Sequence, residues 1–229
     1  MPINELQYKE IIKCFSKSNT HLIAVSKTKP NSEIEQLYAL GQRDFGENYV
    51  QELVDKQAAL PADINWHFIG HLQSNKVKYL APFVYLIHGV DSLKLLQEIN
   101  KQALKNNRTI DCLLQMHIAE EETKFGLDES EIESIKIALP SLKNVRIVGL
   151  MGMASFSEDM GKIKREFMHL KNQFDSIKIW AEKNKMDSTS DGINILSMGM
   201  SGDYQLAIEC GSTMVRIGSL LFGARNYSN

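Results

Sequence analysis

Short apolar segments recur along the chain and alternate with stretches of helical periodicity. Each segment is of strand length, so we expect eight strands separated mostly by helices. The expected strands occupy residues 22–27, 44–47, 65–70, 84–90, 111–118, 145–153, 193–200 and 213–222. This alternation predicts an α/β fold, a single (β/α)8 barrel.

The stretches between the expected strands carry helix signals. A helix from Glu5 to about Lys17 is expected before the first strand, as an addition to the barrel. Ser32 and Glu35 have the spacing of a capping box, and Gly41 follows where that helix should stop. Two further helices are indicated by apolar residues at helical spacing. These residues are Leu93, Leu96, Ile99 and Ala103 in one helix, and Ile163, Phe167, Leu170, Phe174 and Ile177 in the other.

No linker, sequence repeat or low-complexity tract divides the 229 residues, so residues 1–229 are expected to form one domain. A doubly wound open sheet is the alternative arrangement of the same elements. In a barrel, a ligand site would form at the carboxyl ends of the strands, and phosphate often binds after strands seven and eight.

Composition excludes several classes of function. The net charge is −2, with 26 Lys and Arg against 28 Asp and Glu, so neither nucleic acid nor an anionic membrane is indicated as a partner. No apolar run approaches membrane-spanning length and no signal peptide is recognisable, so we expect a soluble cytoplasmic protein. Cys14, Cys112 and Cys210 are interpreted as reduced packing residues. His67 and His71 lack a carboxylate to complete a ligand set, so no metal site is expected and His67 is interpreted as a pocket-wall residue.

A lysine stands at the end of the first expected strand. The segment 21–30 reads HLIAVSKTKP, in which Ile23, Val25 and Lys27 share one face by strand alternation. An ammonium at the end of an apolar face is unfavourable unless it is solvated, paired or used chemically. A lysine that simply extends to water is the ordinary interpretation of such a position.

The last two expected strands end in small residues and hydroxyl groups. Residues 197–201 read SMGMS and residues 215–219 read VRIGS. Small residues leave backbone N–H groups accessible, and together with serine hydroxyls they suit a phosphate. Strands one and eight become neighbours when a barrel closes, so Lys27 and this phosphate cradle are expected to converge.

Five motifs resemble one known family, and the similarity runs in order along essentially the whole chain. The motifs are AVSKTKP at 24–30, FGEN at 45–48, WHFIGHLQSNK at 66–76, SMGMS at 197–201 and VRIGS at 215–219. They closely resemble the pyridoxal phosphate homeostasis proteins, whose fold resembles the barrel domain of alanine racemase. The resemblance implies that pyridoxal 5′-phosphate is carried as a Schiff base on Lys27. It also implies buffering and delivery of the cofactor, transiently to apo forms of enzymes that use it, without significant catalytic turnover.

The resemblance also assigns individual residues to the cofactor. The implied cofactor-binding residues are Lys27, Asn48, Ser197, Ser201, Arg216, Gly218 and Ser219. Of these, Ser201, Gly218 and Ser219 would contact the phosphate, Arg216 would face the pyridine nitrogen and Asn48 would lie near the ring. No catalytic residue is implied.

Capture of the cofactor aldehyde requires a neutral Lys27 amine, and Arg216 would disfavour formation of a carbanion. Desolvation at the barrel mouth and a second ammonium, for which Lys29 is the candidate, would each lower the pKa of Lys27. An arginine is permanently cationic and only donates hydrogen bonds, so Arg216 would favour an unprotonated pyridine nitrogen. An unprotonated nitrogen makes the ring a weaker electron sink. A carrier tolerates this loss, and a racemase that must avoid side reactions tolerates it too.

Two enzymatic functions remain as alternatives. An amino-acid racemase using the same cofactor needs a second acid or base on the opposite face, which alanine racemase takes from a tyrosine of an additional C-terminal domain. We expect that domain to be absent, and Tyr49, Tyr204 and Tyr227 are the candidate substitutes. An aldolase that attacks a sugar phosphate directly through Lys27 would leave Arg216 without a clear role. A barrel without the extra domain is expected to be a monomer.

Overall fold

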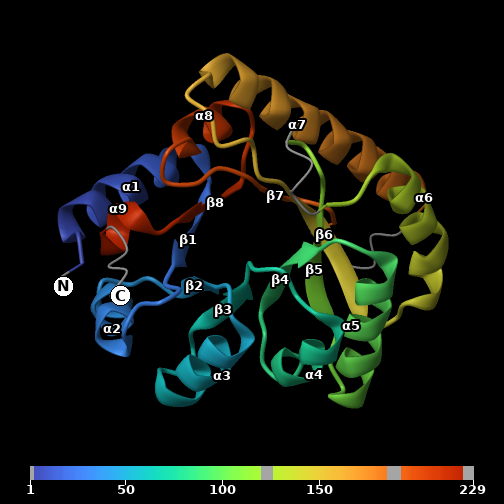
Figure 1. Cartoon of the computed structure of the whole chain (residues 1–229), viewed down its shortest axis with the longest axis horizontal. Coiled ribbons are helices and arrows are strands. Elements are labelled where there is room, and N and C mark those ends of the chain that lie inside the picture. The colour runs from blue at the N-terminus through green and yellow to red at the C-terminus, as the bar shows by residue number, and fades with distance from the viewer. Residues whose placement is uncertain (1–2, 120–125, 185–191, 224–229) are drawn as a thin grey trace.

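The protein is described by a computed structural model that covers residues 3–119, 126–184 and 192–223. Its strands form a closed barrel in the order β1 to β8, and β8 pairs with β1 in parallel (Figure 1). The strands are β1 (His21–Val25), β2 (Asp44–Glu47), β3 (Asn65–Phe68), β4 (Leu86–Val90), β5 (Ile110–Gln115), β6 (Val145–Met151), β7 (Ile195–Ser197) and β8 (Met214–Ile217). The predicted (β/α)8 barrel is therefore confirmed, and the open sheet is wrong.

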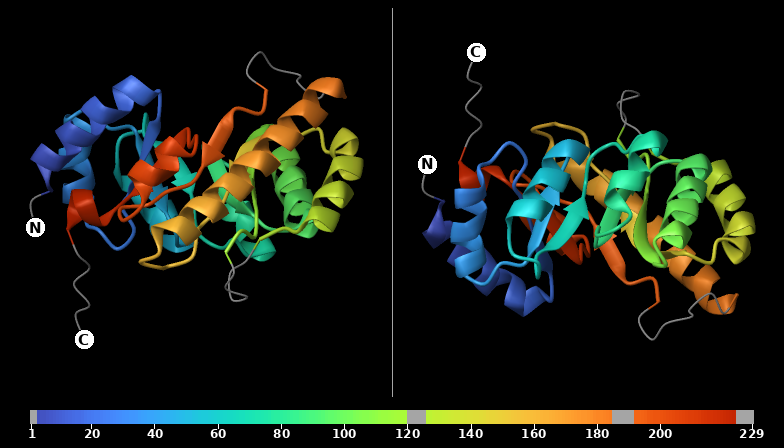
Figure 2. Two further views of the ribbon diagram at one scale, coloured as in Figure 1. Left: turned by 90° about the horizontal axis from the view of Figure 1, so that it is seen from above. Right: turned by 90° about the horizontal axis from the view of Figure 1, so that it is seen from below.

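Helices surround the barrel. They are α1 (Glu5–Ser18), α2 (Asn31–Ala39), α3 (Val50–Ala59), α4 (Val77–Leu80), α5 (Leu93–Lys105), α6 (Glu129–Ala138), α7 (Met160–Lys183), α8 (Tyr204–Glu209) and α9 (Ser219–Phe222). The expected helix before the first strand is α1, which lies beside α9 (Figure 2), where the Asn4 N–H donates to the Leu221 carbonyl at 2.7 Å. In the ranges that the structure describes, no helix combines the length and apolar character needed to cross a membrane.

Strand alternation divides the core into two layers. Inside the barrel, an apolar cluster is formed by Ile23, Leu86, Leu113, Val148, Met151 and Met214. A larger apolar layer fills the space between strands and helices and includes Leu22 and Ala24 of β1. The inward positions near the carboxyl ends of β4, β7 and β8 are polar, with His88, Ser197 and Arg216 all buried. The barrel interior is thus apolar on part of its wall and polar beneath its mouth.

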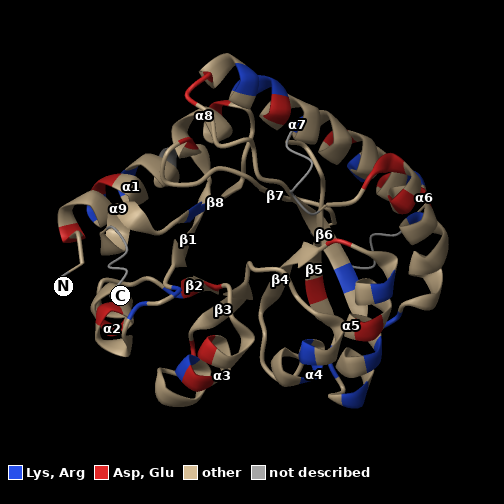
Figure 3. Ribbon diagram, in the orientation of Figure 1, with Lys and Arg blue, Asp and Glu red and all other residues tan. Residues whose placement is uncertain are grey.

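The outer helices carry charges of both signs. Acidic and basic residues are interspersed on α3, α5 and α7 (Figure 3). This distribution agrees with the near balance of 26 basic and 28 acidic residues along the chain. Cys112 and Cys210 are buried as expected, whereas Cys14 is exposed on α1 and is not a packing residue.

Several strands are shorter than the sequence predicts. β1 ends at Val25, so Lys27 lies on the following turn, and β7 covers only Ile195–Ser197. Gly199 has φ +96°, a left-handed conformation outside the extended range of a strand. The expected strand at 213–222 contains β8 and then α9. The apolar pattern continues past the ends of the ladder because residues of the mouth loops are also buried.

The start of α2 differs from the prediction. The helix begins at Asn31 and its N-cap is Pro30, with no side-chain cap, so the Ser32–Glu35 capping box is wrong. Proline before the helix fixes an extended entry and leaves Ser32 inside the first turn. The predicted stop is confirmed, because Gly41 follows the helix with φ +100°. The amphipathic helices predicted around Ile99 and Phe167 are α5 and α7, and both residues are fully buried.

Candidate functional site

A cavity of about 440 Å³ opens at the carboxyl ends of β1, β7 and β8. The loops after these strands, together with residues after β2, β3 and β6, form its wall. Six of the seven residues expected at the cofactor line it: Lys27, Asn48, Ser201, Arg216, Gly218 and Ser219. The predicted convergence of the lysine with the glycine and serine residues of the last two strands is therefore present in the structure.

Lys27 lies on a tight turn between β1 and α2. The Ser26 N–H donates to the Gly46 carbonyl at 3.1 Å, which extends the strand register by one residue. The Lys29 N–H then donates to the Ser26 carbonyl at 3.0 Å and closes the turn around Lys27. Val25, the inward residue before the turn, lines the cavity with Lys27, as the alternation predicts. The turn thus places a half-buried lysine at the mouth of the barrel.

Lys29, the second lysine at the cavity, is held by its own contacts. Its ammonium donates to the Phe222 carbonyl at 2.8 Å and lies 3.9 Å from a carboxylate oxygen of Glu33. These contacts connect the loop after β1 to the end of α9. A second ammonium therefore lies at the same cavity, as expected, and it is oriented by a backbone carbonyl.

Arg216 forms the buried floor of the cavity. Only 5% of the residue is exposed. Its Nη1 donates to Ser197 Oγ at 2.6 Å, and its Nη2 donates to the Gly152 carbonyl at 3.2 Å. Burial lowers the pKa of Arg216 to about 10, and the Asp203 carboxylate opposes that change. The guanidinium is therefore cationic at neutral pH, and Arg216 lines the cavity.

Ser197 lies beneath the cavity and does not line it. Its Oγ accepts from Arg216 and lies 3.3 Å from His88 Nδ1. The seventh expected residue is thus a support for Arg216.

His88 continues the polar contacts through the interior of the barrel. Its Nε2 lies 3.0 Å from His67 Nδ1, and His67 Nε2 lies 3.0 Å from an oxygen of Asp44. Burial, followed by the charges of His67 and Arg216, holds the pKa of His88 well below its ordinary value. A neutral imidazole fits this position because one ring nitrogen can donate while the other accepts.

The expected phosphate residues form a small cradle between the loops after β7 and β8. The Gly218 N–H donates to Ser201 Oγ at 3.3 Å. A side chain at Gly218 would begin 3.2 Å from the Val25 carbonyl, so the close approach of β1 and β8 favours glycine. Ser219 is the first residue of α9 and lines the cavity next to Gly218. Hydroxyl and backbone donors therefore gather at one end of the cavity.

Asn48 contributes an unpaired acceptor. Its Oδ1 is buried and has no hydrogen-bond partner among the described residues. A buried polar atom without a partner is unfavourable by about 1–3 kcal/mol. Since Asn48 lines the cavity, a bound ligand with a suitably placed donor could satisfy this atom.

Apolar residues also line the rim of the cavity, and one of them, Phe156, was not singled out from the sequence. Met153, Phe156 and Met200 line the cavity, and Phe156 is 99% exposed. Met198, by contrast, is fully buried in the core. The signal for Met200 was available, because it stands between Gly199 and Ser201 in a strand-end motif. Nothing in the hydropathy pattern distinguishes Phe156 from an ordinary loop residue.

His67 is placed differently from the expectation. It is not a wall residue of the Lys27 cavity but lies inside the barrel and lines a second cavity at the opposite, amino-terminal end of the strands. His67 points inward by strand alternation, and it lies within β3, two residues before the loop at the mouth begins. His71 contacts a carboxylate oxygen of Asp91 at 3.0 Å. Across the described ranges, no cluster of three or more potential metal ligands is found, and the expectation of no metal site remains a prediction.

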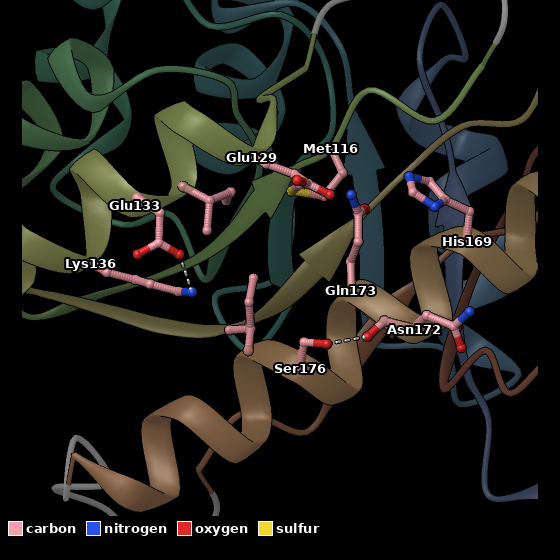
Figure 4. Close-up of a pocket in the computed structure, with 10 residues that line it drawn as sticks. Met116, Glu129, Glu133, Lys136, His169, Asn172, Gln173 and Ser176 are labelled. Atoms are coloured by element: carbon pink, nitrogen blue, oxygen red, sulfur yellow. Dashed lines mark hydrogen bonds and ion pairs between the residues drawn. The ribbon is translucent and has the colours of Figure 1, made fainter.

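Another cavity of about 440 Å³ lies outside the barrel, along α6 and α7 (Figure 4). On its wall the Lys136 ammonium donates to a Glu133 carboxylate oxygen at 2.6 Å. Neither the lysine nor the serines of the expected site approach this cavity. Barrel chemistry is carried by the loops at the carboxyl ends of the strands, so the Lys27 cavity is the candidate site.

The tyrosines considered as a second acid or base do not line the Lys27 cavity in the part of the chain that the structure describes. Tyr49 is 58% exposed, and the Tyr204 ring packs against Phe15 with ring centres 5.9 Å apart. Tyr227 lies outside the described residues.

Comparison with known proteins agrees with this geometry. Residues 6–226 match the family described as alanine racemase, N-terminal domain. A pyridoxal phosphate homeostasis protein of Aquifex aeolicus is 41% identical over 207 residues, covering 90% of this chain and 87% of the relative. The human pyridoxal phosphate homeostasis protein is 40% identical over 221 residues, covering 90% of this chain and 77% of the relative.

Solved structures give the same result. PipY of Synechococcus elongatus, solved with pyridoxal phosphate bound, has a TM-score of 0.83 and 33% identity, covering 95% of this chain and all of that protein. An alanine racemase of Bartonella henselae, with a TM-score of 0.69 and 16% identity, shares the fold. The matched region covers 97% of this chain and 60% of the racemase. By the matched domain and its relatives, this chain belongs to the alanine racemase N-terminal domain family, among the pyridoxal phosphate homeostasis proteins.

Proposed function

We propose that this protein carries pyridoxal 5′-phosphate as a Schiff base on Lys27 and contributes to intracellular homeostasis of the cofactor by buffering and delivery. The observation that carries the proposal is the single cavity of about 440 Å³ that holds Lys27, Arg216 and the serine–glycine cradle together. Cavities of this size suit small cofactors. The homologous PipY was solved with the same cofactor bound, which supports the choice of ligand.

The residues of the cavity fit each part of the cofactor. Its phosphate needs hydrogen-bond donors, which the Ser201 and Ser219 hydroxyls supply beside Gly218 at one end of the cavity. Its ring nitrogen needs a donor, which the buried Arg216 supplies from the floor. The orphaned Oδ1 of Asn48 gains a potential partner. Together with Lys27, these three features of the chain match one ligand.

Bound pyridoxal phosphate supplies an aldehyde for covalent capture and a ring able to accept electrons. The neutral amine of Lys27 adds to the aldehyde carbon, and the carbonyl oxygen leaves as water. The cradle holds the phosphate so that this amine and the aldehyde meet at the barrel mouth. Proximity of this kind favours capture because the reacting groups are already oriented.

We further propose that capture is not followed by significant turnover. Arg216 is cationic at neutral pH, because its pKa of about 10 lies well above 7. A cation beside the pyridine nitrogen opposes protonation of that nitrogen, so the ring withdraws electrons weakly. On this proposal the protein is a carrier, and its transient partners are apo forms of enzymes that use the cofactor. The protein functions as a single-domain monomer.

Absorption spectroscopy tests covalent capture. The purified protein mixed with pyridoxal phosphate should develop a yellow absorption band that borohydride removes. Peptide mapping of the reduced protein should find the cofactor on Lys27. Reduced cofactor on Lys29 would refute the assignment of Lys27. If no absorption band develops and no lysine is labelled, covalent carriage is refuted, and an enzyme that attacks its substrate directly is favoured.

Hydrogen exchange tests the absence of turnover. The loaded protein is incubated with L-alanine in deuterated water, and the α-proton is followed by nuclear magnetic resonance. We expect no exchange at ordinary enzymatic rates, which begin at about 1 s⁻¹. Exchange at such a rate, accompanied by D-alanine, would establish the racemase alternative.

A further inference from the structure

A buried ionic cluster lies directly behind the turn that carries Lys27. Lys56 of α3 is 5% exposed and Glu47 of β2 is fully buried, while the side chain of Glu52, one helical turn before Lys56, is 22% exposed. This cluster lies on the outer side of the strands, where Glu47 follows the inward-facing Gly46. The cluster has no part in the cavity wall.

The three N–H groups of the Lys56 ammonium match three acceptors. The ammonium donates to the Ser26 carbonyl at 2.8 Å, to Glu47 Oε1 at 2.8 Å and to Glu52 Oε1 at 2.7 Å. Ser26 Oγ also donates to Glu47 Oε1, at 2.6 Å. Glu52 Oε1 accepts a further bond, from the Thr28 N–H at 2.6 Å. The cluster therefore binds the main chain on both sides of Lys27.

The two main-chain contacts fix the conformation of Lys27. The Ser26 carbonyl belongs to the peptide plane that precedes Lys27, and the Thr28 N–H belongs to the plane that follows it. Because each peptide unit is planar, a hydrogen bond that holds the C=O of one plane and another that holds the N–H of the next together restrain φ and ψ of the residue between them. Those two angles set the direction in which the Lys27 side chain leaves the backbone.

The turn also includes a conformation that requires support. Thr28 has φ +64°, which is rare for a β-branched residue. Such a conformation is unfavourable by about 1–3 kcal/mol and persists only where surrounding contacts enforce it. The bond from the Thr28 N–H to Glu52 is a contact of this kind.

We propose that Glu52 and Lys56 are positioning residues that aim Lys27 into the cofactor cavity, an inference that rests on the proposed function. They touch neither the cavity nor its expected ligand. Their action is exerted through the two peptide planes beside Lys27, and Glu47 balances the buried charge of Lys56. Capture of the aldehyde then depends on a cluster located on the opposite side of the strands from the cofactor.

The experiment compares Glu52→Ala with Glu52→Gln, because the glutamine keeps an oxygen that can accept from Thr28 and Lys56. Two quantities are measured: hydrogen exchange of the Thr28 amide in the protein without cofactor, and the rate at which added pyridoxal phosphate becomes borohydride-trapped on Lys27. In Glu52→Ala we expect the exchange to rise about tenfold and the capture rate to fall about tenfold. Glu52→Gln should remain within about threefold of the parent in both.

A matched control and a second variant separate positioning from general destabilisation. Asp175→Ala removes the acid of another Lys–acid pair four residues apart, Lys171–Asp175 on α7, and should leave both quantities unchanged. Lys56→Met combined with Glu47→Gln removes the buried charges together and should slow capture as Glu52→Ala does.

The possible results discriminate the two proposals. Parental exchange and parental capture in Glu52→Ala would overturn the positioning role, as would equal losses in Glu52→Ala and Glu52→Gln. If the parent itself captures no cofactor while Thr28 exchange still responds to Glu52→Ala, the proposed function fails and the restraint of the turn stands.

Discussion

The buried His88 predicts a specific loss of stability in mild acid. In the folded protein its pKa lies well below 6.5 because burial, and then the charges of His67 and Arg216, disfavour the imidazolium. In the unfolded chain the same imidazole titrates near 6.5. Below that pH the unfolded state binds a proton that the folded state does not. The free energy of unfolding therefore falls as the pH drops through 6.5, and this contribution is fully present above it.

The size of the effect follows from one proton. With an unfolded pKa of 6.5 and no protonation of folded His88 in the range used, lowering the pH from 7.5 to 5.5 costs about 1.4 kcal/mol. For a protein of this length that loss corresponds to a decrease in melting temperature of about 3–6 °C. Asp44 does not contribute in this range. Burial alone would raise its pKa, but the hydrogen bond and charge of His67 lower it, so its stabilisation is lost only at more acidic pH.

Urea unfolding followed by circular dichroism at pH 7.5, 6.5 and 5.5 measures this loss in the protein without cofactor. The reference is His88→Gln, which keeps a polar side chain but cannot titrate. Other groups that change protonation, such as Glu47, whose pKa burial raises, contribute equally to both proteins. The parent should therefore lose about 1.4 kcal/mol more than His88→Gln between pH 7.5 and 5.5. Equal losses in the two proteins would refute a neutral, buried His88.

Three further predictions concern the cavity and the serine that lies beneath it. Lys27→Ala should abolish the absorption band and leave the melting temperature within about 2 °C of the parent, whereas Lys29→Ala should retain the band. Ser201→Ala combined with Ser219→Ala should weaken cofactor affinity at least tenfold in equilibrium dialysis without preventing capture, since each hydrogen bond to a charged group contributes about 1.5–3 kcal/mol; unchanged affinity would place the phosphate elsewhere. Ser197→Ala leaves an N–H of buried Arg216 unsatisfied and should lower the free energy of unfolding by about 2 kcal/mol, against less than 0.5 kcal/mol for the exposed Ser176→Ala.

Local patterns in the sequence determine most of the fold. The eight apolar segments predict the strands because side-chain period and segment length are properties of the chain itself. The alternation also assigns Ile23, Val25 and Lys27 to one face, and the structure places Ile23 inside the barrel and the other two at its cavity. The ends of the strands are less predictable because loop residues at the mouth are also buried, as the extended prediction at 213–222 shows.

The expected site depends on one additional step, the closure of the barrel. Once strands one and eight are neighbours, Lys27 and the motif containing Arg216 and Gly218 must meet, because β1 and β8 pair from His21 and Met214 onward. Ser197 illustrates the limit of that reasoning. It is expected at the cofactor, but its depth below the mouth makes it a support for Arg216 and removes it from the cavity wall.

The sequence by itself determined the class of fold, the lysine and the strand-end motifs, since each is encoded by neighbouring residues. Only the tertiary structure decided the contacts that support them. Ser197 and His88 are 109 residues apart, and Lys56 is 30 residues from Ser26. Such pairs depend on the register of the strands and the packing of α3, and no local pattern of polar residues specifies which buried partner each will meet.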